Sequence, residues 1–323
     1  MDTQLFHQIV SDQGQLCGDK IIKRTRLYQG RTGRHVERFV IETAAGPASF
    51  VFKPSSYPET VGRELWLQQH FLPFVKNVQY PRILATSSGG DVETYWAIYE
   101  DAGEISHQFT ADDYIAAAKL IPCWHSISVE GLPRAFAHWQ GRDPAVIARG
   151  ILANWQKATG ILAVLHLSLD KVNQLRTWVE AIGCDDMQEK VPSHADYHIG
   201  NIGISHHRLI VLDWENAHVD SVYCDLYSLL DKTHPHFRKA PLDNEVRLRA
   251  LDAYVRKRRE LGWQGPPDDF VLNYFRYAVV HSIWMLLLIC DDLDRGLWNR
   301  AHLTLQKEET YGALMACLAY LDG

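Results

Sequence analysis

Residues 193–230 read SHADYHIGNIGISHHRLIVLDWENAHVDSVYCDLYSLL, and the polar residues in this stretch stand at ordered intervals. The carboxamide of Asn201 follows the carboxylate of Asp196 by five residues, and an apolar run at residues 209–212 leads directly into Asp213. An asparagine and one aspartate can hold Mg²⁺ against a nucleotide, while the other aspartate takes a proton from a hydroxyl group. The spacing therefore predicts a magnesium-dependent site for phosphoryl transfer.

Three motifs in this stretch resemble those of the aminoglycoside phosphotransferase and choline kinase family. Residues 194–201, HADYHIGN, resemble the family's HxDxxxxN catalytic loop, and residues 213–215, DWE, resemble its DWE or DFE motif. Asp225 and Leu226 resemble the Asp-Leu pair that follows in the family. The resemblance implies an α+β, bilobal, protein-kinase-like fold. In that fold a small antiparallel β-sheet lobe with one main helix precedes a larger, mostly helical lobe.

The resemblance also implies a role for each polar residue of these motifs. Asp196 is expected to accept or orient the hydroxyl proton. His194 is expected to support the catalytic loop by packing and hydrogen bonds rather than to transfer a proton, and Asp225 to bond to the backbone of that loop. The implied metal ligands are Asn201, Asp213 and Glu215, the last either directly or through water. The implied cofactor is Mg²⁺, with ATP or GTP as co-substrate.

A lysine at the end of an apolar strand is the expected phosphate contact in the first lobe. Lys53 closes the run SFVF at residues 49–52, and a cation among apolar neighbours needs a partner. The family resemblance assigns this lysine to the α- and β-phosphates. Glu64 is the favoured partner because bulky apolar residues flank it, and Glu59 is the alternative.

Two further segments are candidates for nucleotide binding. Gly30 and Gly33 lie in a hairpin loop, where glycines allow backbone N–H groups to approach phosphates, although a plain hairpin turn explains them equally well. Their position before the strand that ends in Lys53 favours phosphate binding. Glu100 and Asp101 resemble the family's hinge, whose main-chain groups hydrogen-bond the nucleotide base.

Alternating and helical periodicity predicts the elements around these motifs. Strands are expected at residues 20–29, 36–43, 48–53, 81–85 and 94–99, and a helix at 58–71. Later helices are expected at residues 111–128, 144–165, 168–182, 244–261, 268–290 and 298–321. We therefore expect residues 1–102 to form the nucleotide-binding lobe and residues 103–323 to form the catalytic and substrate-binding helical lobe.

Two features of the helical part need separate interpretation. His125 is interpreted as a core histidine bonded to the backbone. Asp291, Asp292 and Asp294 lie between the last two expected helices. They either line a pocket for an amine-bearing acceptor, as the family resemblance implies, or form a solvated interhelical loop whose aspartates cap the next helix.

Composition places the chain among soluble globular proteins and excludes several functional classes. It has 323 residues with 46% hydrophobic and 22% charged residues, and its net charge of −6 argues against a general nucleic-acid binder, which would show a basic face. No signal-peptide pattern or bilayer-spanning apolar run is evident, so no membrane partner is expected. Six scattered cysteines without a CxxC motif indicate free thiols in a reducing cytoplasm.

The sequence thus predicts a cytoplasmic small-molecule kinase that transfers the γ-phosphoryl group of ATP or GTP to a hydroxyl group. The acceptor types open to it are aminoglycosides, choline-like amines, sugars and amino alcohols. The alternative is a non-catalytic kinase-like protein, which loss of Lys53, Asp196, Asn201 or Asp213 would mark, and all four are present. Residues 218–222 depart from the family's Gly-Asp-Pro type turn, which weakens any transfer of substrate specificity.

Overall fold

The computed structural model describes residues 3–29, 33–133, 136, 144–182, 189–239, 242–265, 268–296 and 299–323. The chain forms two compact units, called unit 1 and unit 2 below. Unit 1 comprises Met1–Ser106 and Gly203–Asn216, and unit 2 comprises His107–Ile202 and Ala217–Gly323. The expected division after residue 102 differs from this in two respects. The first unit extends to Ser106, and it includes a segment from the middle of the chain that carries Asp213 and Glu215.

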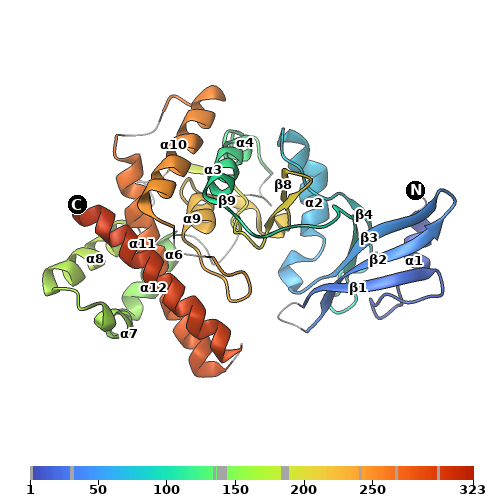
Figure 1. Cartoon of the computed structure of the whole chain (residues 1–323), viewed down its shortest axis with the longest axis horizontal. Coiled ribbons are helices and arrows are strands. Elements are labelled where there is room, and N and C mark those ends of the chain that lie inside the picture. The colour runs from blue at the N-terminus through green and yellow to red at the C-terminus, as the bar shows by residue number, and fades with distance from the viewer. Residues whose placement is uncertain are drawn as a thin grey trace. The chain divides into compact units, whose positions relative to one another are not determined.

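Unit 1 is built on a five-stranded antiparallel sheet with the strand order β1-β2-β3-β5-β4 (Figure 1). The strands are β1 (Ile21–Gln29), β2 (His35–Thr43), β3 (Gly46–Pro54), β4 (Ile83–Thr86) and β5 (Trp96–Glu100). All five predicted strands are therefore present, each within about two residues of its expected ends. This sheet, with the mainly helical unit 2, confirms the α+β fold class.

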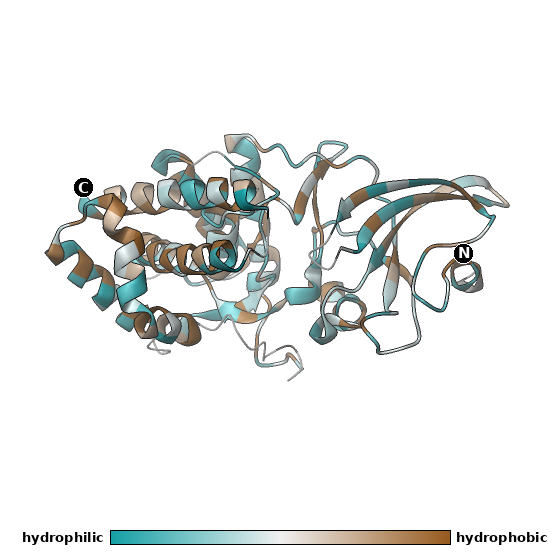
Figure 2. Cartoon of the chain, turned by 90° about the horizontal axis from the view of Figure 1, so that it is seen from below, coloured by the Kyte–Doolittle hydropathy of each residue, from teal (hydrophilic) through white to brown (hydrophobic). Residues whose placement is uncertain are grey.

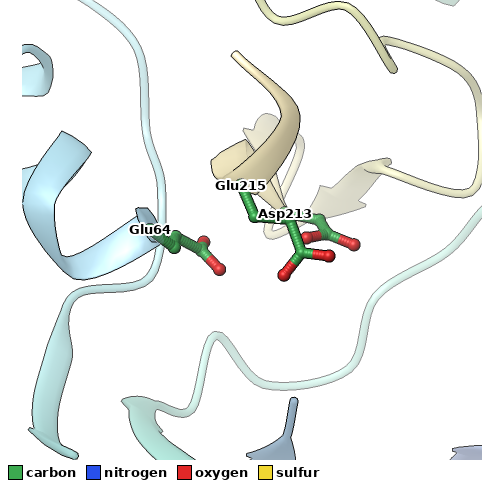
Figure 3. A group of neighbouring side chains, drawn as sticks. All are labelled: Glu64, Asp213 and Glu215. Atoms are coloured by element: carbon green, nitrogen blue, oxygen red, sulfur yellow. The ribbon is translucent and has the colours of Figure 1, made fainter. Parts of the chain in front are cut away.

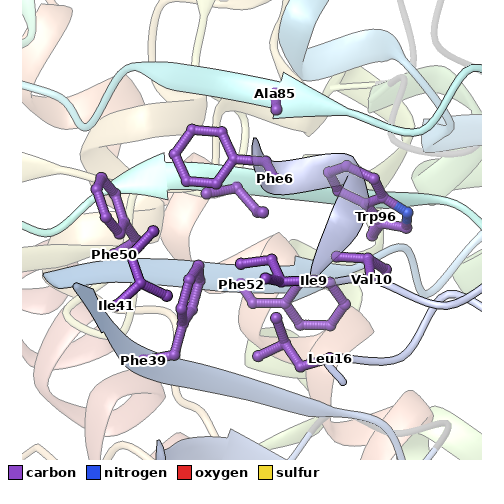
Figure 4. Packing of buried hydrophobic residues seen from close by; sticks show 11 residues of the cluster. Phe6, Ile9, Val10, Leu16, Phe39, Ile41, Phe50, Phe52, Ala85 and Trp96 are labelled. Carbon is purple, nitrogen blue, oxygen red and sulfur yellow. The ribbon is translucent and has the colours of Figure 1, made fainter. Parts of the chain in front are cut away.

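Side-chain alternation along β3 separates the core of unit 1 from its polar residues. Phe50 and Phe52 are buried with Phe39, Ile41 and Ile98 on one face of the sheet, which the short helix α1 (Thr3–Gln8) covers through Phe6 (Figure 4). Successive residues of a strand point to opposite faces, so Lys53 points away from this core. Its cross-strand partner is Ala97, and Val51 is opposite Tyr99, which places Lys53 and Tyr99 on the same face.

Helix α2 (Arg63–His70) begins later than predicted and positions Glu64 in its first turn. The expected helix at 58–71 is interrupted because Gly62 has a φ of 71°, a left-handed conformation that cannot continue a right-handed helix. Pro58–Thr60 forms a separate 3₁₀ turn before it. The break places the side chain of Glu64 in the interior of unit 1 while Glu59 stays exposed.

A hairpin from the middle of the chain completes unit 1. Strands β7 (Ile202–Ser205) and β8 (Arg208–Val211) pair with each other, and the backbone N–H of Val211 donates to the carbonyl of Gln79 at 2.8 Å. The 3₁₀ turn Trp214–Asn216 follows β8 directly. The hairpin therefore carries Asp213 and Glu215 into the unit that also holds Lys53.

Unit 2 consists mainly of helices. Those at or near predicted positions are α3 (Ala111–Leu120), α4 (Pro122–His125), α6 (Pro144–Ala153), α7 (Trp155–Leu162), α8 (Leu169–Ile182), α10 (Asn244–Glu260), α11 (Phe270–Arg295) and α12 (Arg300–Asp322). The expected helix at 111–128 divides near Pro122, which lacks a backbone N–H to donate. Helix α9 (Cys224–Leu230) and the paired strands β6 (Lys190–Ser193) and β9 (His218–Ser221), which were not predicted, flank the catalytic-loop segment.

Helix α11 is longer than predicted and corrects the interpretation of the acidic cluster. Asp291, Asp292 and Asp294 lie within its last turns, not in a loop between helices, and Lys157 pairs with Asp291 at 2.5 Å and with Asp294 at 3.4 Å. Apolar residues dominate much of the sequence of α11. In Figure 2 the helices near the C-terminus carry many brown, hydrophobic residues. Among the described residues α11 is the one helix long and apolar enough to cross a membrane, and 67% of its most apolar stretch is buried inside the fold.

Candidate active site

Four charged side chains meet in unit 1 around the end of strand β3. The ammonium of Lys53 lies 2.7 Å from Asp213, 3.1 Å from Glu215 and 3.5 Å from Glu64. Figure 3 shows the three carboxylates gathered from helix α2 and from the segment after β8, and one oxygen of each lies within 4.8 Å of the others. The structure thus brings together the predicted lysine, its favoured partner and two predicted metal ligands.

Neighbouring groups hold this cluster in position. The hydroxyl of Tyr99 donates to Glu64 at 2.7 Å, and both side chains are buried. Arg63 donates to the backbone carbonyl of Glu215 at 2.9 Å. Asp213 has a φ of 60°, a conformation that non-glycine residues seldom adopt and that occurs mainly where surrounding contacts enforce it, often at functional sites.

The electrostatics of the cluster favour an additional cation. Burial alone would lower the pKa of Lys53, but Asp213, Glu215 and Glu64 outweigh burial and raise that pKa well above its ordinary value. Burial, and then the neighbouring Asp213, raise the pKa of Glu215 to about 8. Even with Glu215 protonated, the two carboxylates of Glu64 and Asp213 exceed the one ammonium in charge, and hard divalent cations such as Mg²⁺ prefer oxygen ligands. The donor set therefore fits the implied metal.

The catalytic-loop segment lies in unit 2 and is held through its backbone. One oxygen of Asp225 accepts hydrogen bonds from the backbone N–H of His194 at 2.9 Å, and the other accepts from that of Ala195 at 2.8 Å. Ala195 has a φ of 62°, so these bonds hold a left-handed residue in place. The predicted bond from Asp225 to the loop backbone is confirmed.

The support for Asp225 comes from two buried aromatic side chains. Trp124 donates to Asp225 at 2.7 Å, and His125 lies 3.1 Å from the same oxygen. Burial alone would raise the pKa of Asp225, but the hydrogen bond from His125 and further neighbours hold it below its ordinary value. His125 is a core histidine as predicted, but its ring contacts Asp225 and the hydroxyl of Tyr254 at 3.0 Å instead of the backbone.

Asp196 is surrounded by donors from unit 2. The carboxamide of Asn201 donates to its Oδ2 at 3.1 Å, and Lys232 forms an ion pair with its Oδ1. His198 accepts from the N–H of Gly200 through Nδ1 at 3.0 Å, so a neutral ring carries its proton on Nε2, 3.7 Å from Asp196. Burial lowers the pKa of His198, which favours that neutral form.

The remaining predicted residues have the following environments. His194 is fully buried, and its Nδ1 accepts from the N–H of Asp196 at 3.3 Å, in keeping with the supporting role expected of it. Gly33 has a φ of 80°, and Gly30 lies outside the described residues. The side chain of Glu100 pairs with Arg82, and that of Asp101 pairs with Arg38 at 2.8 Å. These contacts leave the proposed base-binding role of this segment to its main chain.

Among the residues that touch predicted site residues without having been predicted are Tyr99 and Lys232. Tyr99 reaches Glu64 only because β3 and β5 pair in a register that places it on the same face as Lys53. Lys232 lies 36 residues beyond Asp196 and belongs to none of the three motifs. A signal for Lys232 was present in the basic segment KTHPHFRK at residues 232–239, which contains no acidic residue.

A lysine beside three carboxylates in unit 1 and a loop aspartate among donors in unit 2 are groups that phosphoryl transfer can use. The model of the phosphotransferase enzyme family matches residues 29–263, most of the chain, and the chain belongs to this family. No curated protein sequence matches it. The predicted phosphotransferase class of enzyme is thereby confirmed.

Solved structures show the same fold at low sequence identity. The gentamicin-APH(2″)-IIa complex matches with a TM-score of 0.55 and 16% identity, covering 98% of each chain. An amicoumacin kinase in complex with AMP-PNP and Ca²⁺ matches with a TM-score of 0.56 and 11% identity, covering 98% of this chain and 94% of that one. Choline kinase from Cryptosporidium parvum has a TM-score of 0.52 and 13% identity, with coverage of 99% and 95%. The predicted protein-kinase-like fold is confirmed.

Proposed function

We propose that this enzyme transfers the γ-phosphoryl group of ATP, or of GTP, to a hydroxyl group of a small molecule in the cytoplasm. The observation that carries the proposal is the cluster of Lys53 with Glu64, Asp213 and Glu215, because it pairs a phosphate-binding cation with oxygen ligands for a metal. Family membership supports the reaction class. The five cysteines within the described residues are free thiols, which supports a reducing compartment.

In the proposed mechanism unit 1 holds the nucleotide phosphates. Lys53 binds the α- and β-phosphates, and Glu64, fixed by Tyr99, keeps the ammonium in position. Asp213 and Glu215 would hold Mg²⁺, with Asn201 as a further proposed ligand. When bound, Mg²⁺ would offset the negative charge of the phosphates. The main chain at Glu100 and Asp101 is assigned to the nucleotide base. The loop that contains Gly30 and Gly33 is assigned to the phosphates.

Unit 2 supplies the proposed base. Asp196 accepts the hydroxyl proton of the acceptor, and the donors on its carboxylate fix its orientation. The acceptor oxygen forms a bond to the γ-phosphorus as the bond to the β,γ-bridging oxygen breaks, and ADP leaves. His194 supports the loop from inside the protein and takes no proton. The acceptor types considered are hydroxyl-bearing amines, sugars, aminoglycosides and amino alcohols.

Turnover measurements test this function. Release of ADP from MgATP or of GDP from MgGTP, together with phosphorylated product, would be measured against hydroxylated acceptors, in the wild type and in the Asp196→Asn and Lys53→Met variants. We expect transfer to at least one acceptor, a loss of kcat of about 10³-fold or more in Asp196→Asn, and a higher KM for the nucleotide in Lys53→Met. Nucleotide binding to the wild type with no transfer to any acceptor would instead indicate a non-catalytic protein.

A further inference from the structure

A basic segment of unit 2 begins at the carboxylate of the proposed base. Residues 232–239, KTHPHFRK, follow helix α9, and we call them the basic segment. At its first residue, Lys232 pairs with Asp196, and the side chains of the two are 18% and 17% exposed. The pair is therefore largely shielded, and both side chains remain partly exposed to solvent. Because salt bridges in such surroundings are weakly screened, the charge of Lys232 is strongly felt there.

The fold of unit 2 fixes the position of the basic segment. The backbone N–H of Lys232 donates to the carbonyl of Tyr227 at 2.8 Å. Thr233 is bonded to Thr310 at 2.7 Å between hydroxyls, and Gln306 donates to the carbonyl of Thr233 at 3.1 Å. Both partners of Thr233 lie on helix α12. These contacts fix the backbone position of Lys232.

Aromatic and imidazole rings lie near Lys232. The rings of His198 and His234 are stacked with centroids 4.9 Å apart, and Phe237 lies 5.2 Å from His234. Burial lowers the pKa of His234 to about 3, and the neighbouring His198 and Lys232 act in the same direction, so this ring is neutral at pH 7. The neutral ring of His234 adds no charge here, so Lys232 supplies the positive charge beside Asp196.

The other cations of the basic segment are turned to structural partners. Arg238 pairs with Glu309 at 2.8 Å, and Lys239 is buried and donates to the carbonyl of Leu229 at 3.0 Å. Lys232 differs because the carboxylate it pairs with is the proposed base itself. During the reaction the carboxylate of Asp196 has to accept a hydroxyl proton. A second anion that binds Lys232 would draw the lysine away from Asp196, so that this carboxylate can accept the proton.

We infer that Lys232 binds an anionic group of the acceptor, so that the substrate is a small molecule carrying a carboxylate or phosphate near its reactive hydroxyl. The inference rests on the proposed function and names the acceptor class of the same site. An acceptor of this kind would replace Asp196 as the ion-pair partner of Lys232, while Asp196 keeps the hydrogen bond from Asn201. A purely cationic acceptor, such as a choline-like amine or an aminoglycoside, would instead place like charge beside Lys232.

Matched acceptor pairs test the inference. L-serine differs from 2-aminoethanol by one carboxylate, and glycerol 3-phosphate differs from glycerol by one phosphate, so the two pairs distinguish the two anions. We expect kcat/KM in the wild type to be at least about 10-fold higher for the anionic member of one pair, as one charge-assisted hydrogen bond would give. A wild type that prefers the uncharged or cationic members would overturn the inference.

Substitution of Lys232 distinguishes binding of an anionic acceptor from a role on the phosphoryl group and from a role on Asp196 alone. In Lys232→Gln the preference for the anionic member should fall towards unity, mainly through a higher KM, and Lys232→Glu should favour 2-aminoethanol over L-serine. Lys157→Gln is the control, since it removes another lysine of unit 2 that pairs with carboxylates, Asp291 and Asp294. If Lys232→Gln lowers kcat equally for both members and keeps their ratio, Lys232 acts on the phosphoryl group or on Asp196 alone, and the inference is wrong.

Calorimetric measurement of the binding of the same acceptor pairs tests the inference independently of the proposed function. Anion-selective binding that Lys232→Gln abolishes, in a protein without turnover, would overturn the kinase reaction and retain the anion site. Equal binding of both members, in a protein that transfers phosphate, would overturn the anion site and retain the kinase reaction.

Discussion

At the scale of single residues, motif spacing predicted the phosphotransferase class but not the contacts around the predicted site residues. Asp196, Asn201 and Asp213 were predicted because their spacing in the sequence is itself the signal. Tyr99 and Lys232 were not, because each meets its partner through tertiary structure. Residues that position a catalytic group are set by strand register and loop anchoring, which a single sequence does not express.

Tyr99→Phe tests whether positioning of Glu64 matters for nucleotide binding. The change removes the 2.7 Å bond to Glu64 and leaves the ring in place. We expect the KM for ATP to rise about 3- to 10-fold and the free energy of unfolding to fall by about 1 kcal/mol, because Glu64 then holds Lys53 less well. Steady-state kinetics and urea unfolding measure the two effects.

Tyr311→Phe is the matched control for this prediction. Tyr311 donates to the carbonyl of Ile161 at 2.7 Å and lies in unit 2, outside the Lys53 cluster. Its loss should lower stability by a similar amount with no change in the KM for ATP. Equal nucleotide KM values in Tyr99→Phe and Tyr311→Phe would show that Tyr99 has only a structural role.

At the scale of elements, long periodic segments were predicted well and short or interrupted ones were not. Helix α10 was expected at 244–261 and spans Asn244–Glu260, because its pattern runs through several turns. The four-residue strands β6 and β9 offer too few residues for a period to show. Helix α11 continues through its aspartates to Arg295 and ends at Gly296, whose φ of 65° is a left-handed cap that apolar periodicity does not report.

The start of helix α2 depends on one backbone conformation. Gly62 has a φ of 71°, and a side chain added there would meet only the Tyr95 hydroxyl at 3.8 Å. Gly62→Ala should therefore lower the free energy of unfolding by about 1–2 kcal/mol through backbone strain rather than through a clash. Gly89→Ala is the control, because a side chain there meets nothing within 4 Å and its φ lies outside the left-handed range. Similar unfolding midpoints in urea for the two variants would contradict this account of where α2 begins.

At the scale of the whole molecule, the connectivity of the units was the feature that sequence patterns could not supply. The segment Gly203–Asn216 belongs to unit 1 although the chain on both sides of it belongs to unit 2. Periodicity is a local signal, and the bond from Val211 to Gln79 joins residues far apart in the chain. A division of the chain at one point was therefore the natural prediction, and it assigned Asp213 and Glu215 to the helical part.

The titration of Lys239 should make the free energy of unfolding depend on pH. Burial lowers the pKa of Lys239 to about 7, and Arg247 adds to this effect against the opposing charge of Asp231. In the unfolded chain the pKa of a lysine is about 10.4. Between these two values the unfolded chain binds the extra proton, so stability should rise with pH from about 7 to about 10. Below about pH 7 the cost of charging the buried lysine is present in full.

Lys239→Met should remove this dependence, because methionine fills similar space without a titrating group. Relative to the variant, the wild type should gain up to about 1.4 kcal/mol of unfolding free energy per pH unit between pH 7 and 9, as one proton per molecule requires. Urea unfolding at pH 7, 8 and 9 measures the difference, and Lys76→Met, at an exposed position, is the control for loss of one lysine. The difference in slope between the wild type and Lys239→Met reports the titration of Lys239. Parallel curves for the wild type and Lys239→Met would mean that the lysine stays charged inside the fold, held by Asp231.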